Sequence, residues 1–171
     1  MIRLMGALLV IGSAGAMGYL GAAALKRRAR VIEGLILSLQ LMESEICSRM
    51  TPMREVLEML SSSAPQEVRG LYRRAVGGMS ALGRCSFYTI WKNAVADSRE
   101  LRLRPEESEL VSELGLCLGR YDVHEQAAAI DRLRRRLELI LKRAEAERDR
   151  DCRLHAFLGL ASGIFAVIIL L

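Results

Sequence analysis

The sequence predicts an all-α protein, in which a cytoplasmic bundle of about six helices is flanked by a transmembrane helix at each end. Apolar residues of the central part recur at three- and four-residue spacing, as on one face of a helix, and no stretch alternates as a β-strand would. Two long segments without a formal charge, 4–25 and 154–171, stand at opposite ends of the 171 residues. Prolines and serines between the periodic stretches mark the helix boundaries.

The first apolar segment is long enough to cross a membrane. Its 22 residues, 4–25, extend far enough at about 1.5 Å per residue to cross a hydrocarbon core of about 30 Å. A basic cluster follows at once, as after a stop-transfer anchor: Lys26, Arg27, Arg28 and Arg30. A secretory signal peptide cleaved near 22–24 is the alternative. It is less favoured, because the apolar run is long for such a peptide and the basic flank lies on the wrong side.

The second apolar segment, 154–171, has 18 residues, which is just enough for one span. Arginines precede it and none follows, so the positive-inside rule places both inner flanks in the cytoplasm. We therefore expect a cell-membrane protein with two spans. Its parts are an N-terminal anchor (1–25), a cytoplasmic bundle with a long charged final helix (26–153) and a C-terminal span (154–171). The four dispersed cysteines agree with reduced thiols in a cytosolic domain.

The central part divides into helices at its prolines and serines. A first helix is expected over 29–50, because apolar residues form one stripe there: Leu35, Leu39, Met42, Ile46 and Met50. Thr51 would cap the next helix, with Pro52 at its first position. Ser63 and Gln66 have the spacing of a capping box.

Four further helices complete the bundle. We expect them over 66–80, over 87–98, from Pro105 onward, and over 122–153. Acidic residues after Pro105 suit the positive end of a helix dipole: Glu106, Glu107 and Glu109. The last helix has an apolar stripe of Ile130, Leu133, Leu137, Ile140 and Ala144. Phe87, Tyr88, Ile90 and Trp91 form one helical patch, for which core packing is the default and a partner-binding anchor the alternative.

A helix boundary is the main structure predicted for residues 114–126, LGLCLGRYDVHEQ. Gly115 would let a neighbouring helix approach closely, and Gly119 suits a left-handed turn at a helix end. Asp122 fits an N-cap, with Glu125 at capping-box spacing. His124 and its acidic neighbours lack the i, i+4 geometry of a zinc helix. We expect no metal, no cofactor and no catalysis, since no nucleophile motif or phosphate-binding loop is present.

The final helix has an arginine-rich face, formed by Arg132, Arg134, Arg135 and Arg136. It is a candidate docking face for a partner protein or for anionic lipid. The favoured interpretation is a solvated face with ion pairs to Glu138, Glu145 and Glu147. Nucleic-acid binding is not expected, because aromatic residues do not interleave with these arginines.

The chain resembles the stage III sporulation protein AB family of endospore-forming bacteria. The resemblance rests on the N-terminal RLMGALLVIGSAGAMGY, the basic residues after it, LILSLQLMESEI, and the second anchor. Its most specific part is the pattern L-G-x-x-L-G-x-x-D-x-x-x-Q. The matching residues are Leu114, Gly115, Leu118, Gly119, Asp122 and Gln126.

The resemblance implies a function that the residues alone do not. The family contributes to a secretion-like channel complex between mother cell and forespore. Its cytoplasmic domain is similar to the inner-membrane platform proteins of type II secretion and type IV pilus machines. By resemblance this chain is a non-enzymatic platform in the mother-cell membrane that faces the stage III AA ATPase, other stage III channel proteins and membrane lipid. Platform relatives have two bundles, so a homo-oligomer is also implied. The alternative is a generic membrane-tethered helical adaptor for another cytosolic partner.

Overall fold

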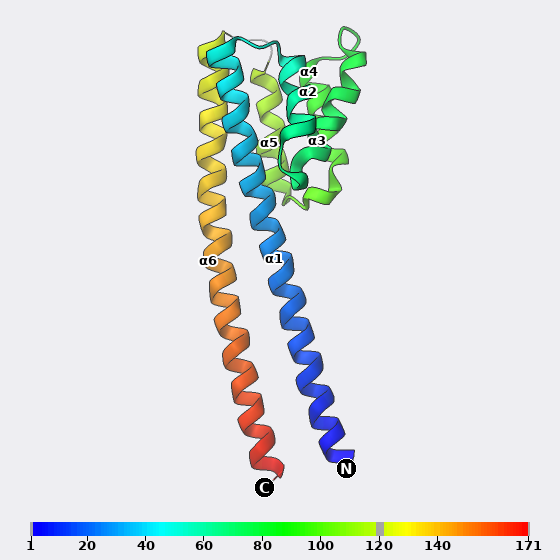
Figure 1. Cartoon of the computed structure of the whole chain (residues 1–171), viewed down its shortest axis with the longest axis vertical. Helices are drawn as coiled ribbons and strands as arrows, with labels where there is room; N and C mark the ends of the chain where they lie inside the picture. Colours follow the sequence, from blue (N-terminus) through cyan, green and yellow to red (C-terminus); the bar gives the residue numbers. More distant parts are fainter. Residues whose placement is uncertain (1, 119–121, 171) are drawn as a thin grey trace. The chain divides into compact units, whose positions relative to one another are not determined.

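The computed structural model describes residues 2–118 and 122–170, with the side chains of 26–118, 122–147 and 150. The described chain is all-α, as predicted, and contains no strand beyond an isolated bridge between Leu82 and Cys85 (Figure 1). Its α-helices are α1 (Ile2–Arg49), α2 (Met53–Ser63), α3 (Gln66–Gly78), α4 (Phe87–Asp97), α5 (Pro105–Cys117) and α6 (Val123–Leu170). Two short 3-10 helices, η1 (Met79–Ala81) and η2 (Arg99–Leu101), connect them.

The chain forms two compact units. One, the helix pair, joins Met1–Ala29 to Lys142–Leu171, and in it Arg28 and Glu147 form an ion pair of 3.6 Å. The other, the bundle, comprises Arg30–Leu141. Among the described residues, none of the helices combines the length and the apolar character that a membrane span needs. The two segments expected to span, 4–25 and 154–171, lie outside the residues whose side chains are described.

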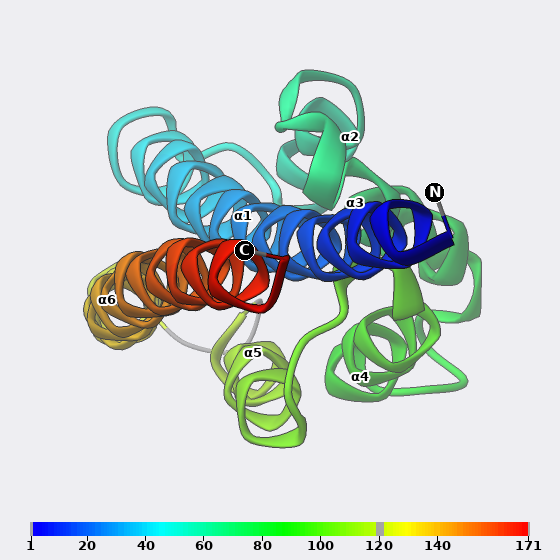
Figure 2. The same cartoon turned by 90° about the horizontal axis from the view of Figure 1, so that it is seen from below.

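The core of the bundle is built on α1. In the end-on view, α2, α3, α4 and α5 lie in that order around the bundle part of α1 (Figure 2). One continuous set of buried apolar side chains joins α1 to α6, which is the arrangement that removes most apolar surface from water. Four residues of the predicted α1 stripe are buried: Leu35, Leu39, Met42 and Ile46. From α6, Ile130, Leu133 and Leu137 join the same core, as their spacing predicted.

Met50 does not belong to this core, contrary to the prediction. Its side chain is 77% exposed, because α1 ends at Arg49 and Met50 takes a left-handed backbone conformation (φ 52°). The chain therefore turns away from the helix axis one residue before the stripe would have continued.

The helix starts near the prolines are correct, but two predicted caps are wrong. The Thr51 hydroxyl donates to the Glu45 carboxylate (3.0 Å), and the Ser63 hydroxyl donates to the Met59 carbonyl (2.7 Å). Pro52 and Pro65 take the N-cap positions of α2 and α3, which have no side-chain cap. The proline ring supplies the backbone angle that a capping residue would otherwise favour.

Candidate interaction surface

One side of α5 packs tightly against α4. Trp91 of α4 is buried, and its indole N–H donates to the Val111 carbonyl at 2.8 Å. A Cβ added to Gly115 would lie 2.8 Å from Cδ1 and 3.0 Å from Cβ of Trp91. A glycine is therefore required here for the two helices to approach this closely. Phe87 stacks on Trp91 with ring centroids 6.4 Å apart, so the aromatic patch is mainly core, as its default interpretation predicted.

The pattern that includes Gly115 is divided between core and surface. Leu114 and Leu118 are buried in the core with Gly115. Gly119 lies outside the described residues. Asp122 is exposed just before α6, where its carbonyl accepts the Gln126 N–H at 3.0 Å. These contacts give Leu114, Gly115 and Leu118 a structural role, and α6 begins one residue after the expected N-cap.

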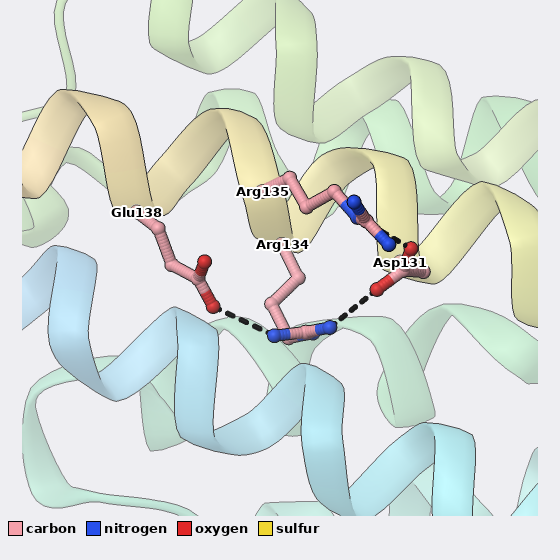
Figure 3. A network of polar contacts seen from close by, with 4 residues as sticks. All are labelled: Asp131, Arg134, Arg135 and Glu138. Carbon is pink, nitrogen blue, oxygen red and sulfur yellow. Dashed lines mark hydrogen bonds and ion pairs between the residues drawn. The ribbon is translucent and has the colours of Figure 1, made fainter.

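Arg134 and Arg135 are held within α6 by a network of ion pairs (Figure 3). Arg134 donates to Asp131 and, at 2.7 Å, to Glu138, whereas Arg135 donates to Asp131 at 2.8 Å. The guanidinium of Arg134 lies on the side of α6 that faces α1 (Figure 3). Hydrogen bonds from Arg135 and then Arg134 hold the pKa of Asp131 below its usual range. The predicted pairing with Glu138 is present, and Glu147 pairs with Arg28.

Arg132 and Arg136 lie on the side of α6 away from Arg134, beside a groove shared with α5. The groove holds about 160 Å³ and is lined by Leu110, Glu113, Leu114, Cys117, Ala129, Arg132, Leu133 and Arg136. Within the described part of the chain, neither Arg132 nor Arg136 makes a hydrogen bond or an ion pair. Arg132 and Arg134 are two residues apart, hence about 200° apart around the helix. The four arginines therefore do not form one face.

The acidic face of α5, which reaches this groove at Glu113, was not anticipated from the sequence. Glu106, Glu109 and Glu113 are all exposed on α5, and none forms an ion pair with a described residue. Their spacing of three and four residues places them on one face of the helix, which is a pattern that the sequence does contain. Of these three, only Glu106 lies in the first turn of α5 and suits the helix dipole, because Glu109 follows that turn and Glu113 lies in the third. What the sequence does not show is that Glu113 of this face lines the same groove as Arg132 and Arg136 of α6.

The buried serines and the buried glutamate of the bundle bond to the backbone of their own helix or of its N-cap residue. The hydroxyls of Ser38, Ser98 and Ser112 donate to carbonyls four residues earlier, at 2.7 Å in each case. Glu107 is also buried and accepts the backbone N–H of Arg104 at 2.8 Å. Burial raises the pKa of Tyr72, an effect that a hydrogen bond with Ser38 partly opposes. Among the described residues, no three His, Cys, Asp or Glu side chains are grouped to hold a metal ion.

Comparison with known proteins places the chain in a family. The sequence model described as Stage III sporulation protein AB matches residues 3–171. The chain belongs to the stage III sporulation protein AB family. A solved structure titled Stage III sporulation protein AB is similar, with a TM-score of 0.65 and 26% identity, over 72% of this chain and 98% of that one. No curated protein matches the sequence. Membership of the stage III sporulation protein AB family gives this chain a role in sporulation.

Proposed function

We propose that the chain is a non-enzymatic membrane platform of the secretion-like channel complex between mother cell and forespore. During engulfment it couples a cytoplasmic ATPase to membrane components. Segments 4–25 and 154–171 anchor it in the mother-cell membrane, and the bundle faces the mother-cell cytoplasm. Family membership over residues 3–171 is the observation that most supports this role.

The interior of the bundle favours a scaffold over an enzyme. Its largest buried side chains are apolar or aromatic, and its buried serines bond to the backbone of their own helices. Catalytic groups need a cleft in which a base or nucleophile is positioned beside the substrate. The groove between α5 and α6 instead combines apolar walls with exposed charges, which is the composition of a protein-binding surface.

The ATPase partner is the stage III AA ATPase. Its proposed contact is the exposed face of α6 that contains Arg135. Arg135 is the best candidate there, because its side chain is 72% exposed while its ion pair with Asp131 fixes its direction. An exposed guanidinium of fixed direction suits a carboxylate on a partner, because its planar donors match two carboxylate oxygens.

Binding of the full-length chain to the ATPase tests this function. The chain is reconstituted in lipid nanodiscs, and saturable binding of the ATPase from the same organism is expected. Arg135→Glu should weaken that binding. Arg54→Glu is the matched control, since Arg54 is also exposed and also pairs with a carboxylate four residues away, that of Glu58 at 3.0 Å. No binding at high micromolar concentration would reject direct coupling and favour the generic adaptor.

A further inference from the structure

Two neighbouring helices of the bundle expose opposite charges. The α5 face contains Glu106, Glu109 and Glu113, and the α6 face contains Arg132 and Arg136. We call these the acidic row and the basic pair. Glu113 and both arginines line the same groove, yet no ion pair of 4.0 Å or less joins the acidic row to the basic pair. Both sets of charges therefore remain available to another molecule.

Apolar side chains accompany the charges on both helices. The groove between them is walled by Leu110, Leu114 and Leu133. Leu116 of α5 and Leu139 of α6 are 44% and 57% exposed. Apolar surface bordered by charged side chains is typical of a surface that another protein covers.

The occupant that best fits this surface is another copy of the same surface. Within the bundle α5 and α6 run in opposite directions along nearly parallel lines (Figure 1). Because Glu113, Arg132 and Arg136 line one groove, they lie at similar heights along these helices. A two-fold axis parallel to the two helices keeps each residue at the same position along the axis. It places α5 of one copy opposite α6 of the other. It would therefore bring the acidic row of one copy against the basic pair of the other, twice.

We propose that the chain forms a two-fold symmetric dimer through the α5–α6 groove. Glu109 and Glu113 of each copy pair with Arg132 and Arg136 of the other, and the exposed leucines meet near the axis. A two-fold contact requires such a self-complementary patch, in which residue i meets residue j and j meets i. The proposal goes beyond the platform role and is independent of ATPase binding.

Charge reversal on one helix at a time tests the pairing. Glu109→Arg/Glu113→Arg makes the four proposed pairing side chains of a copy all positive, and Arg132→Glu/Arg136→Glu makes the same four all negative. The mass of the full-length chain in detergent micelles is measured by light scattering, and folding is checked by circular dichroism. We expect a dimer for the wild type, which dissociates at high salt because exposed charges are screened. Each reversed variant should be monomeric, and Arg54→Glu should remain a dimer.

The decisive step is to mix the two variants. The four pairing side chains are positive in one variant and negative in the other, so they are complementary across the two-fold axis. The mixture should therefore form heterodimers although neither variant dimerises alone. Differently tagged variants, co-expressed and purified through one tag, should therefore co-purify. If these charges pair only within one chain, the two variants should not associate when they are mixed. A monomeric wild type, or a mixture that does not associate, overturns the proposal.

ATPase binding is measured on the same preparations. If the wild type binds the ATPase but no heterodimer forms, the dimer is wrong and the platform role stands. If heterodimers form but the ATPase does not bind, the dimer stands and direct coupling is wrong.

Discussion

The two sides of α5 are built in contrasting ways. On one side Gly115 lies against Trp91, and the two helices approach so closely that an added Cβ would be only 2.8 Å from the indole. On the other side a groove of about 160 Å³ separates α5 from Arg132 and Arg136 of α6. The closed side is apolar and hydrogen-bonded, whereas the open side has charges without partners among the described residues.

This contrast indicates that residues on the closed side of α5 stabilise the fold, whereas residues on the open side bind other molecules. Close packing without voids holds helices in one arrangement, and substitutions there are costly. Exposed charges contribute little to folding, since surface pairs are each worth about 0–1 kcal/mol. We therefore expect substitutions on the closed side to change the free energy of unfolding, and substitutions on the open side to change association.

Truncation of Trp91 should have the largest effect on folding. Trp91→Ala removes a buried indole and its hydrogen bond to Val111, so it should lower the unfolding free energy by about 3–5 kcal/mol. Urea unfolding of the full-length chain in micelles, followed by circular dichroism, measures the loss. Leu82→Ala is the control, because Leu82 is 52% exposed and its loss should cost less than about 0.5 kcal/mol. Equal costs for both would contradict a closed side built around Trp91.

Addition of a single methyl group to Gly115 should be the next most costly change. Gly115→Ala crowds Cβ and Cγ of Trp91, and overpacking of this kind costs about 1–3 kcal/mol. Gly77→Ala, where nothing lies within 4 Å of the added Cβ, should instead stabilise α3 by up to about 1 kcal/mol. Opposite signs for the two substitutions in the same assay would establish the close approach; a gain at Gly115 would refute it.

Tyr72 in the closed interior should make the free energy of unfolding sensitive to high pH. Its ring lies 6.1 Å from that of Trp91, and burial raises its pKa above the ordinary 10.0. Above about pH 10 the unfolded chain releases this proton while the folded chain keeps it. Stability should therefore be fully present below pH 10 and fall by roughly 1.4 kcal/mol per pH unit above it. Tyr72→Phe should remove this fall and Tyr88→Phe should not, as pH-dependent unfolding can show.

On the open side, loss of the groove arginines should leave folding almost unchanged. Arg132→Ala/Arg136→Ala removes two side chains that make no ion pair with described residues, so the unfolding free energy should change by less than about 0.5 kcal/mol. Association between copies should be lost with the same variant. A large loss of stability would mean that these arginines belong to the fold.

The smallest effect concerns Asp131. Its pKa is lowered mainly by the hydrogen bond from Arg135, so Arg135→Gln should raise that pKa towards the ordinary value. The stabilisation from Asp131 is present above its unfolded pKa and disappears as the pH falls through its folded pKa. Nuclear magnetic resonance titration of the carboxyl in the two proteins measures the difference. Arg54→Gln, a change on α2, should leave the titration of Asp131 where it is.

Much of the fold could be predicted because it depends on local pattern. Periodic apolar residues predict the α1 and α6 stripes, prolines mark the starts of α2, α3 and α5, and Gly115 predicts a close helix contact. The end of α1 was missed by one residue, since nothing in the sequence around Met50 requires its left-handed turn. The groove could not be predicted, because it depends on which face of α5 lies beside α6.

The candidate interaction surface on α5 and α6 could be predicted only in part for the same reason. Four arginines within five positions look like one face in the sequence, whereas in the fold Asp131 and Glu138 engage Arg134 and the groove lies beside Arg132 and Arg136. Helical spacing gives the angle between side chains but not the neighbour at each angle. That assignment requires the packed bundle.

We propose that the open side of the bundle performs the sporulation function and that the closed side only supports it. The most direct test is the number of heat-resistant spores formed by an endospore-forming strain whose own family member is replaced by this chain. With Arg132→Glu/Arg136→Glu, at protein levels equal to wild type, spore formation should stop at stage III as in the strain without the gene. A normal spore count from the stable, reversed protein would contradict the account.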